Sequence, residues 1–181
     1  MQSLQSDSDD ALLSDAIQGL RRGDFSRLEQ LFDERSGRSG RPRIVEWNEE
    51  GCFRDEPEAM AEALTCACFL GRAGVADYLL KQGASPSGGA GTGLNALHWA
   101  ANRGQLEAVQ LLIRAGTPLE TRSMYDGTAL GTAIWAAINE PRRDHAQIIE
   151  ELLKAGASLE DVGYPTGHER IDAILQHYRS S

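Results

Sequence analysis

The chain has 181 residues, of which 41% are hydrophobic and 25% are charged, and this composition is typical of a single globular domain with a sizeable core. The net charge of −9 disfavours nucleic acid and anionic membranes as partners, because like charges repel at long range. The N-terminus has no apolar secretory segment and the chain has no run of about 18 apolar residues, so we expect a cytoplasmic protein.

A helical N-terminal cap is expected over residues 10–35. After Gly23, four apolar residues recur at helical spacing, at Phe25, Leu28, Leu31 and Phe32. The same offsets follow Gly104 later in the chain, at Leu106, Val109, Leu112 and Ile113. The N-terminal segment is therefore interpreted as a degenerate copy of a unit that repeats downstream.

Residues 36–54 interrupt this pattern and are interpreted as a loop, a lengthened first finger. The stretch SGRSGRP has the composition of a flexible loop. Residues 43–53, RIVEWNEEGCF, alternate around an Asn-Glu-Glu-Gly turn, which predicts a small β-hairpin. A long helix is then expected to begin with Asp55 as its cap and Pro57 in its first turn.

Three similar units follow, and they cover residues 55–87, 88–120 and 121–160. Their leading leucines are 33 residues apart, at Leu64, Leu97 and Leu130. The third unit contains an insertion, INEPRRD, after which the register resumes. A fixed period of this length is the signature of a repeat architecture, in which each unit buries its apolar face against its neighbours.

Each unit predicts two helices joined by a turn. In the second unit, the first helix has a stripe of Leu97, Ala100 and Ala101, whose small side chains allow close packing, and the second helix is bulkier. Asn95 and Thr128 are typical N-caps of the first helices. Three glycines suit the left-handed turns that end the second helices: Gly83, Gly116 and Gly156.

A C-terminal capping helix is expected within residues 161–181. Thr166 and Glu169 have the spacing of a capping box. An apolar stripe follows at Ile171, Ile174, Leu175 and Tyr178. A stack of repeats requires such terminal units, because the outer face of the last repeat has no neighbour.

The repeated units resemble the ankyrin repeat. The resemblance is carried by Asn95 to His98, by Ala100, Ala101, Gly104, Leu111, Leu112, Ala115 and Gly116, by Asp126 to Leu130, and by Leu152 to Ala157. It implies an all-α ankyrin-repeat solenoid of stacked helix-turn-helix units with hairpin-like finger loops, folded as one domain over residues 1–181. It also implies a non-catalytic protein–protein interaction module without a cofactor, which binds a partner through a concave groove and finger loops.

The histidines and the glycine-rich run are given structural interpretations. In the ankyrin pattern the histidine at His98 ties neighbouring turns together, and its counterparts Thr65 and Gly131 offer no catalytic partner. The other histidines are interpreted as surface residues: His145, His168 and His177. The run GGAGTG at 88–93 lacks the preceding strand and the following Lys-Ser or Lys-Thr of a phosphate-binding loop, so we expect an inter-repeat finger.

Neither the cysteines nor the arginines indicate a metal or nucleic-acid site. Cys66 and Cys68 diverge on a predicted helix, and no second ligand pair completes a zinc site. An odd number of cysteines agrees with reduced thiols. The basic cluster Arg35, Arg38, Arg41 and Arg43 is followed by an acidic run that largely cancels its field, so we expect a solvated loop.

The face of the first helices opposite the core stripe is the candidate partner-binding surface. It places aromatic and polar residues in columns at helical spacing, which is how interfaces supply anchoring side chains. The candidate residues are Phe69, Trp99, Asn102, Arg103 and Trp135, with Arg122, Met124 and Tyr125 from the third finger. Alternatively, Phe69 and Trp135 pack under neighbouring loops.

The sequence is also compatible with two other functions. Gly131 lies inside a predicted helix one turn before Trp135, so a shallow pocket bounded by His98, Gly131 and Trp135 could serve a small molecule or an enzymatic role. The second alternative is a structural subunit that self-associates through its groove. We expect a monomer or a weak homodimer.

Overall fold

The structure is a computed structural model that describes residues 2–89, 91 and 93–180. Over those residues the chain forms α-helices and one 3-10 helix, η1, and no β-strand. In chain order the elements are α1 (Gln2–Arg22), α2 (Phe25–Leu28), η1 (Glu29–Phe32), α3 (Arg43–Glu49), α4 (Pro57–Leu70), α5 (Ala73–Lys81), α6 (Ala96–Asn102), α7 (Leu106–Arg114), α8 (Ala129–Asn139), α9 (His145–Lys154) and α10 (Glu169–Arg179). The predicted all-α class is confirmed.

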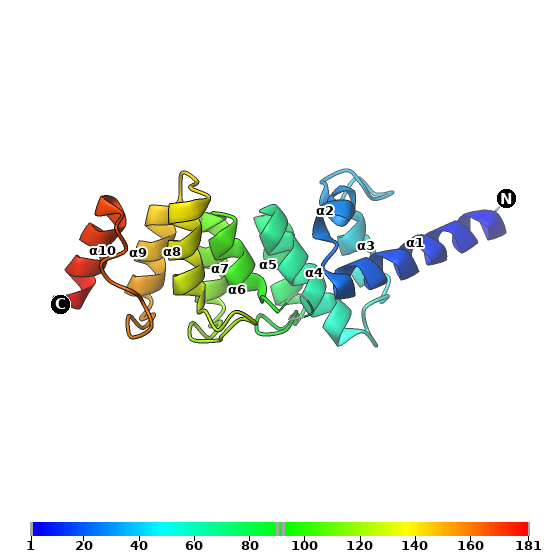
Figure 1. The fold of residues 1–181 in the computed structure, drawn as a ribbon. Helices are drawn as coiled ribbons and strands as arrows, with labels where there is room; N and C mark the ends of the chain where they lie inside the picture. Colours follow the sequence, from blue (N-terminus) through cyan, green and yellow to red (C-terminus); the bar gives the residue numbers. More distant parts are fainter. Residues whose placement is uncertain (1, 90, 92, 181) are drawn as a thin grey trace.

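The helices form an elongated row of stacked hairpins (Figure 1). The first helices α4, α6 and α8 pack side by side in one layer, and the second helices α5, α7 and α9 pack side by side in the other. The connections after α5, α7 and α9 all lie on one side of the row and are called fingers below. Helices α1 to α3 cover one end and α10 covers the other.

The second helices end alike, as the three glycines predict. Gly83, Gly116 and Gly156 have φ values of +94°, +75° and +98°, the left-handed region that glycine adopts without strain. Beyond Gly83, the Ala84 amide donates to the Leu79 carbonyl at 3.0 Å, and equivalent bonds follow α7 and α9. These bonds satisfy carbonyls that the helix end leaves open, and they direct each chain into its finger.

Small residues bring the first helices close together. Ala67, Ala100 and Ala133 occupy the same place in successive units, and each is 0% exposed. The leucines that mark the repeat are also buried, at Leu64, Leu97 and Leu130. Because alanine adds only a methyl group, neighbouring helices can approach without voids, which explains why the alanine stripe predicted the stacking surface.

The helix starts confirm the predicted caps Asn95 and Thr128. The Asn95 Oδ1 accepts from the His98 amide at 3.1 Å, and the Thr128 Oγ1 accepts from the Gly131 amide at 3.2 Å. The predicted Asp55 cap is wrong, because α4 begins at Pro57 and its N-cap residue is Glu56, without a side-chain bond. Helix α4 therefore starts well before the point at which α6 and α8 start.

The N-terminal cap has the predicted buried stripe, but two short helices carry it instead of one continuous helix. Phe25, Leu28 and Phe32 are buried and Leu31 is half-buried. They lie on the short helices α2 and η1, whereas α1 is a separate, long helix that contacts α2 and α4. The apolar spacing identified the core side but not the break between the two short helices.

Residues 43–53 do not form the predicted β-hairpin. Residues 43–49 form α3, which buries Ile44, Val45 and Trp47 against η1 and α5. Ile44 and Trp47 are three residues apart, which suits one face of a helix, whereas Val45 and Trp47 are two apart, which suits one face of a strand. A strand would also need a partner for its backbone groups, whereas a helix satisfies its own.

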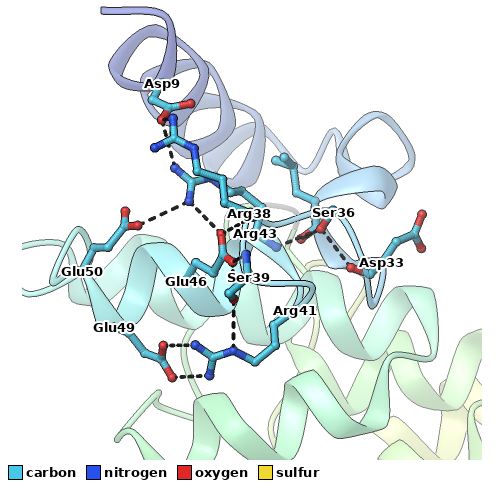
Figure 2. Close-up of polar contacts among 11 residues, drawn as sticks. Asp9, Asp33, Ser36, Arg38, Ser39, Arg41, Arg43, Glu46, Glu49 and Glu50 are labelled. Atoms are coloured by element: carbon cyan, nitrogen blue, oxygen red, sulfur yellow. Dashed lines mark hydrogen bonds and ion pairs between the residues drawn. The ribbon is translucent and has the colours of Figure 1, made fainter. Parts of the chain in front are cut away.

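An ion-pair network centred on the buried Arg43 attaches α3 to α1 (Figure 2). Arg43 is 6% exposed, and its guanidinium lies 2.9 Å from Glu46, 3.3 Å from Asp9 of α1 and 3.4 Å from Glu50. Its side chain also lies over the Trp47 ring, at 5.1 Å from the centroid. A buried guanidinium is tolerated only when several acceptors surround it, as they do here.

The loop before α3 is folded around Glu46. Its carboxylate accepts from the Arg38 amide at 2.9 Å and from the Ser39 amide at 2.6 Å, and the Ser39 hydroxyl donates to it as well. The Ser39 hydroxyl bond is the largest cause that lowers the pKa of Glu46 to about 2. Arg41 pairs with Glu49 through two bonds, so acids neutralise much of the basic cluster locally.

The predicted capping box at the last helix is wrong. Helix α10 begins at Glu169 with His168 as its N-cap residue. Thr166 lies outside the helix, and its amide and hydroxyl both donate to Asp172 Oδ1 at 2.7 Å. The aspartate in the first turn therefore organises this helix start. Inside α10, Ile171 and Leu175 are buried, as the stripe predicts.

Candidate functional site

Phe69 and Trp99 form an aromatic cluster with Phe25 of the N-terminal cap. The ring centroids are 5.6 Å apart for Phe25 and Phe69, 5.0 Å for Phe69 and Trp99, and 6.3 Å for Phe25 and Trp99. The last two pairs meet edge to face, an arrangement that aromatic rings prefer. The candidate residues Phe69 and Trp99 are half-buried, so this part of the candidate surface joins the cap to the first two repeats.

Arg103 belongs to the same cluster. Its guanidinium carbon lies 4.7 Å from the centroid of Phe69, a stacked cation–π contact. The Arg103 Nε is buried and has no hydrogen-bond acceptor in the described part of the chain. The arginine covers the aromatic ring and is half-buried itself. At this end of the candidate surface, the aromatic cluster and Arg103 are therefore packed mostly against one another.

Trp135 differs from the other aromatic candidates because it is not packed. It lies on α8 with 52% of its surface exposed. Ile138, one turn further along the helix, is 38% exposed, so the two side chains form an apolar patch on one helix face. The sequence prediction missed Ile138, although its spacing of three residues from Trp135 was a usable signal.

The finger between α7 and α8 carries the other exposed candidates. Met124 is 66% exposed and Tyr125 is 75% exposed. Arg122 fixes the finger, because it donates to the Asp126 carbonyl at 2.9 Å and pairs with Asp161 of the next finger. The Met124 amide donates to the Gly93 carbonyl of the preceding finger at 2.9 Å, so bonds also join successive fingers.

His98 has the predicted structural role. It is 1% exposed, its Nδ1 lies 2.7 Å from Asn95 Oδ1, and its Nε2 donates to the Gly127 carbonyl at 3.1 Å. The second bond joins α6 to the following finger. Burial lowers the pKa of His98. Because the ring is buried inside the stack and its Nε2 is bonded to a carbonyl, the imidazole is not available as a base at the surface.

The surface interpretation of His145 is wrong. Its side chain is 2% exposed, and its Nε2 donates to the Asn102 carbonyl at 3.1 Å. Its Nδ1 accepts from the Arg142 amide at 3.1 Å. His145 therefore connects α6 to the inserted segment before α9, whereas Arg143, beside it, is exposed. His168 and His177 are exposed, as predicted.

Among the described residues, only the Thr128 hydroxyl lies close to the space that a Gly131 side chain would occupy. A Cβ at Gly131 would meet only the Thr128 Oγ1, at 3.7 Å. His98 cannot supply a titratable group to this space, since it is buried and its Nε2 is bonded to the Gly127 carbonyl. Of the three residues proposed to bound a pocket, His98, Gly131 and Trp135, only Trp135 presents an exposed side chain beside this open space.

The cysteines are thiols without a metal-binding arrangement. Cys52, Cys66 and Cys68 are free. Burial raises the pKa of Cys68 to about 12 and that of Cys66 well above its ordinary value, so both are protonated at neutral pH. The described residues contain no group of three or more His, Cys, Asp or Glu side chains placed to hold a metal ion.

The comparisons with known proteins agree with the stacked hairpins. A family model of ankyrin repeats matches three copies over residues 64–162, slightly more than half of the chain. The search of curated proteins found no match. Across the described ranges, no helix combines the length and apolar character needed to cross a membrane.

Proposed function

Because the chain belongs to the ankyrin-repeat family, whose repeats generally serve as protein–protein interaction modules and are typically non-catalytic, we propose that it binds another protein through the exposed side of its first helices and the α7–α8 finger. The observation that carries this proposal is Trp135, a tryptophan with 52% of its surface exposed on a rigidly stacked helix. Tryptophan supplies more binding energy at interfaces than most side chains, so an exposed one is a natural anchor.

The proposed contact residues differ in what they contribute. Trp135 and Ile138 supply an apolar anchor, and Met124 and Tyr125 add exposed apolar area on the finger. Asn102, Arg103 and Arg122 are the proposed polar contacts, of which Arg103 stacks on Phe69 and Arg122 pairs with Asp161. Phe69 and Trp99 lie mostly within the aromatic cluster, so they support this surface from beneath more than they contact a partner.

Pre-ordering supports the proposal energetically. The stacked helices, the buried His98 and the bonds between fingers hold the surface in place before a partner arrives. Binding to an ordered surface loses less conformational entropy than binding that must first fold a segment. We also propose a cytoplasmic location for this interaction, which the three free thiols support.

Capture of partners from native cytoplasm by the full chain tests the proposal. We expect Trp135→Ala to lose specific partners that the wild-type chain retains. Leu12→Ala is the matched control, because Leu12 is an exposed hydrophobic residue of α1, 44% exposed, outside the proposed surface. An unchanged set of captured proteins in Trp135→Ala would refute this surface as the binding site.

Sedimentation distinguishes self-association from binding to a different protein. If the surface served a second copy of the chain, the sedimentation coefficient would rise with concentration and Trp135→Ala would abolish the rise. We expect no such rise over the concentrations at which partners are captured.

A further inference from the structure

A hollow of about 600 Å³ lies at the other end of the stack from Trp135. Its walls come from the end of α1, from the first turns of α4 and from the glycine-rich finger between α5 and α6. Its lining includes Arg21, Glu58, Ala61, Glu62, Gly88 and Gly91. None of them belongs to the surface proposed above.

The early start of α4 creates this hollow. Glu62 precedes Asn95 by 33 residues, the repeat period, and therefore occupies the place at which α6 has its N-cap. In the first repeat the helix already began at Pro57, so Glu62 lies inside α4 and does not cap a helix. Its carboxylate is free for another purpose, and the extra turns of α4 form a wall that the other repeats lack.

The glycines of the finger lie too close to the walls for larger residues. A Cβ at Gly88 would come within 2.7 Å of the Ala61 Cβ. A Cβ at Gly91 would come within 2.7 Å of both the Arg21 carbonyl and the Glu62 Oε1. Among the described residues of this run, glycine therefore allows the finger to lie against α1 and α4.

Glu62 is the unusual group in the hollow. The residue is 5% exposed, and its Oε1 accepts from the Gly91 amide at 2.7 Å. Its Oε2 is enclosed and has no hydrogen-bond donor in the part of the chain that the structure describes. A carboxylate oxygen removed from water without a donor is unfavourable, so the arrangement is incomplete.

The charges around the hollow point to a cation as the missing donor. Arg21 is already paired with Glu56 at 2.5 Å. Glu58 and Glu62 have no ion pair among the described residues, which leaves two carboxylates and no unpaired positive charge. An anionic ligand would be repelled, and a neutral ligand without a donor would leave the buried Glu62 oxygen uncompensated, whereas water solvates the exposed Glu58.

We infer that this hollow binds a cationic side chain, lysine or arginine, of the protein partner, with its N–H group donating to Glu62 Oε2 and its alkyl stem against Ala61. Such side chains place an apolar stem along apolar surface and a charged head on a carboxylate. The source of the side chain rests on the proposed function, whereas the hollow's preference for cations does not.

Titration of the full chain with small probes tests the inference directly. The probes are N-acetyl-lysine amide and N-acetyl-arginine amide, and N-acetyl-norleucine amide is the neutral control of similar shape. The readout is the NMR shift of the Gly91 amide, which donates to Glu62. We expect both cations to shift this signal saturably and the norleucine amide to leave it in place.

Variants locate the binding group. Glu62→Gln should weaken binding of both cations by about tenfold or more, whereas Glu107→Gln, at an exposed glutamate of α7, should leave it unchanged. Equal response to the norleucine amide, no response to either cation, or unchanged affinity in Glu62→Gln would each overturn the inference. The wild-type comparison of probes decides the matter even if Glu62→Gln fails to fold.

These results are distinguishable from a failure of the proposed function. The probe titration reports on the hollow without any partner. Partner capture with Trp135→Ala reports on the other end of the stack. A cation response combined with unchanged capture would refute only the Trp135 surface.

Discussion

The Nε2 of His145 donates to the backbone carbonyl of Asn102 at 3.1 Å, across the boundary between two repeats. The same ring accepts the Arg142 amide on its Nδ1, so this geometry requires a neutral imidazole with its proton on Nε2. Protonation would turn the acceptor nitrogen into a donor that faces another donor. The contact is therefore a structural bond that acid should weaken.

Stability should fall as the pH drops from about 7.5 to 5, in part because of His145. Burial lowers the pKa of His145 below its ordinary value of 6.5, so the unfolded chain binds a proton more readily than the folded chain does. Stability must then rise with pH through that range. Urea denaturation at several pH values measures this slope, and His145→Gln should reduce it. His168→Gln, at an exposed position, should not, and equal slopes in all three proteins would contradict the assignment.

Glu46 should also contribute stability that acid removes, at a lower pH than His145. Its folded-state pKa of about 2 lies below the ordinary value of 4.5, so its contribution is complete above about pH 4.5 and is lost as the pH falls towards 2. We expect Glu46→Gln to lose about 2 kcal/mol of unfolding free energy at pH 7, with a smaller loss at pH 3. Denaturation curves at both pH values measure the difference, and a loss independent of pH would exclude a contribution from the ionised Glu46 carboxylate and its bonds to Ser39, Arg38 and Arg43.

Gly131→Ala should stabilise the protein by about 1 kcal/mol. The glycine lies inside α8, and the added methyl group would touch only Thr128 Oγ1 at 3.7 Å. Gly88→Ala is the contrasting variant and should destabilise, since its methyl group would collide with Ala61. Thermal unfolding compares the two. A destabilised Gly131→Ala would mean that a neighbouring group uses this space, and unchanged partner capture by a stabilised variant would show that binding does not need it.

Phe69→Ala should lower the free energy of unfolding more than Trp135→Ala does. Phe69→Ala removes the ring that joins Phe25, Trp99 and Arg103, and we expect a loss of about 2–3 kcal/mol. Trp135→Ala removes a side chain that is 52% exposed, and we expect a loss below about 1 kcal/mol. Chemical denaturation of both variants checks the ranking. The reverse order would place Trp135 in the core and Phe69 at the surface.

Local patterns could predict most of the fold. The period of 33 residues, the alanine stripes, the caps Asn95 and Thr128 and the glycines after the second helices are all properties of short segments. They specify helices and their buried faces whatever lies elsewhere in the chain. The segment at 43–53 was mispredicted because its apolar spacing suits both a strand and a short helix, and contacts with η1 and α5 decide between them.

The candidate surface could be predicted only in part. Helical spacing placed Phe69, Trp99 and Trp135 on related faces, but exposure depends on what covers each face. Phe25 of the N-terminal cap covers the first two, and nothing among the described residues covers Trp135 to the same extent. The buried position of His145 and the unpaired oxygen of Glu62 likewise arise from segments that are distant in the chain.

The sequence by itself therefore determined the repeated helical hairpin, because hydrogen bonds and apolar spacing within a few turns are encoded locally. Only the tertiary structure decided which aromatic residues are buried, which histidines join repeats and where an acidic hollow forms. Those properties depend on neighbours brought together by stacking, and the burial or exposure of a side chain is a property of that assembly rather than of its own segment.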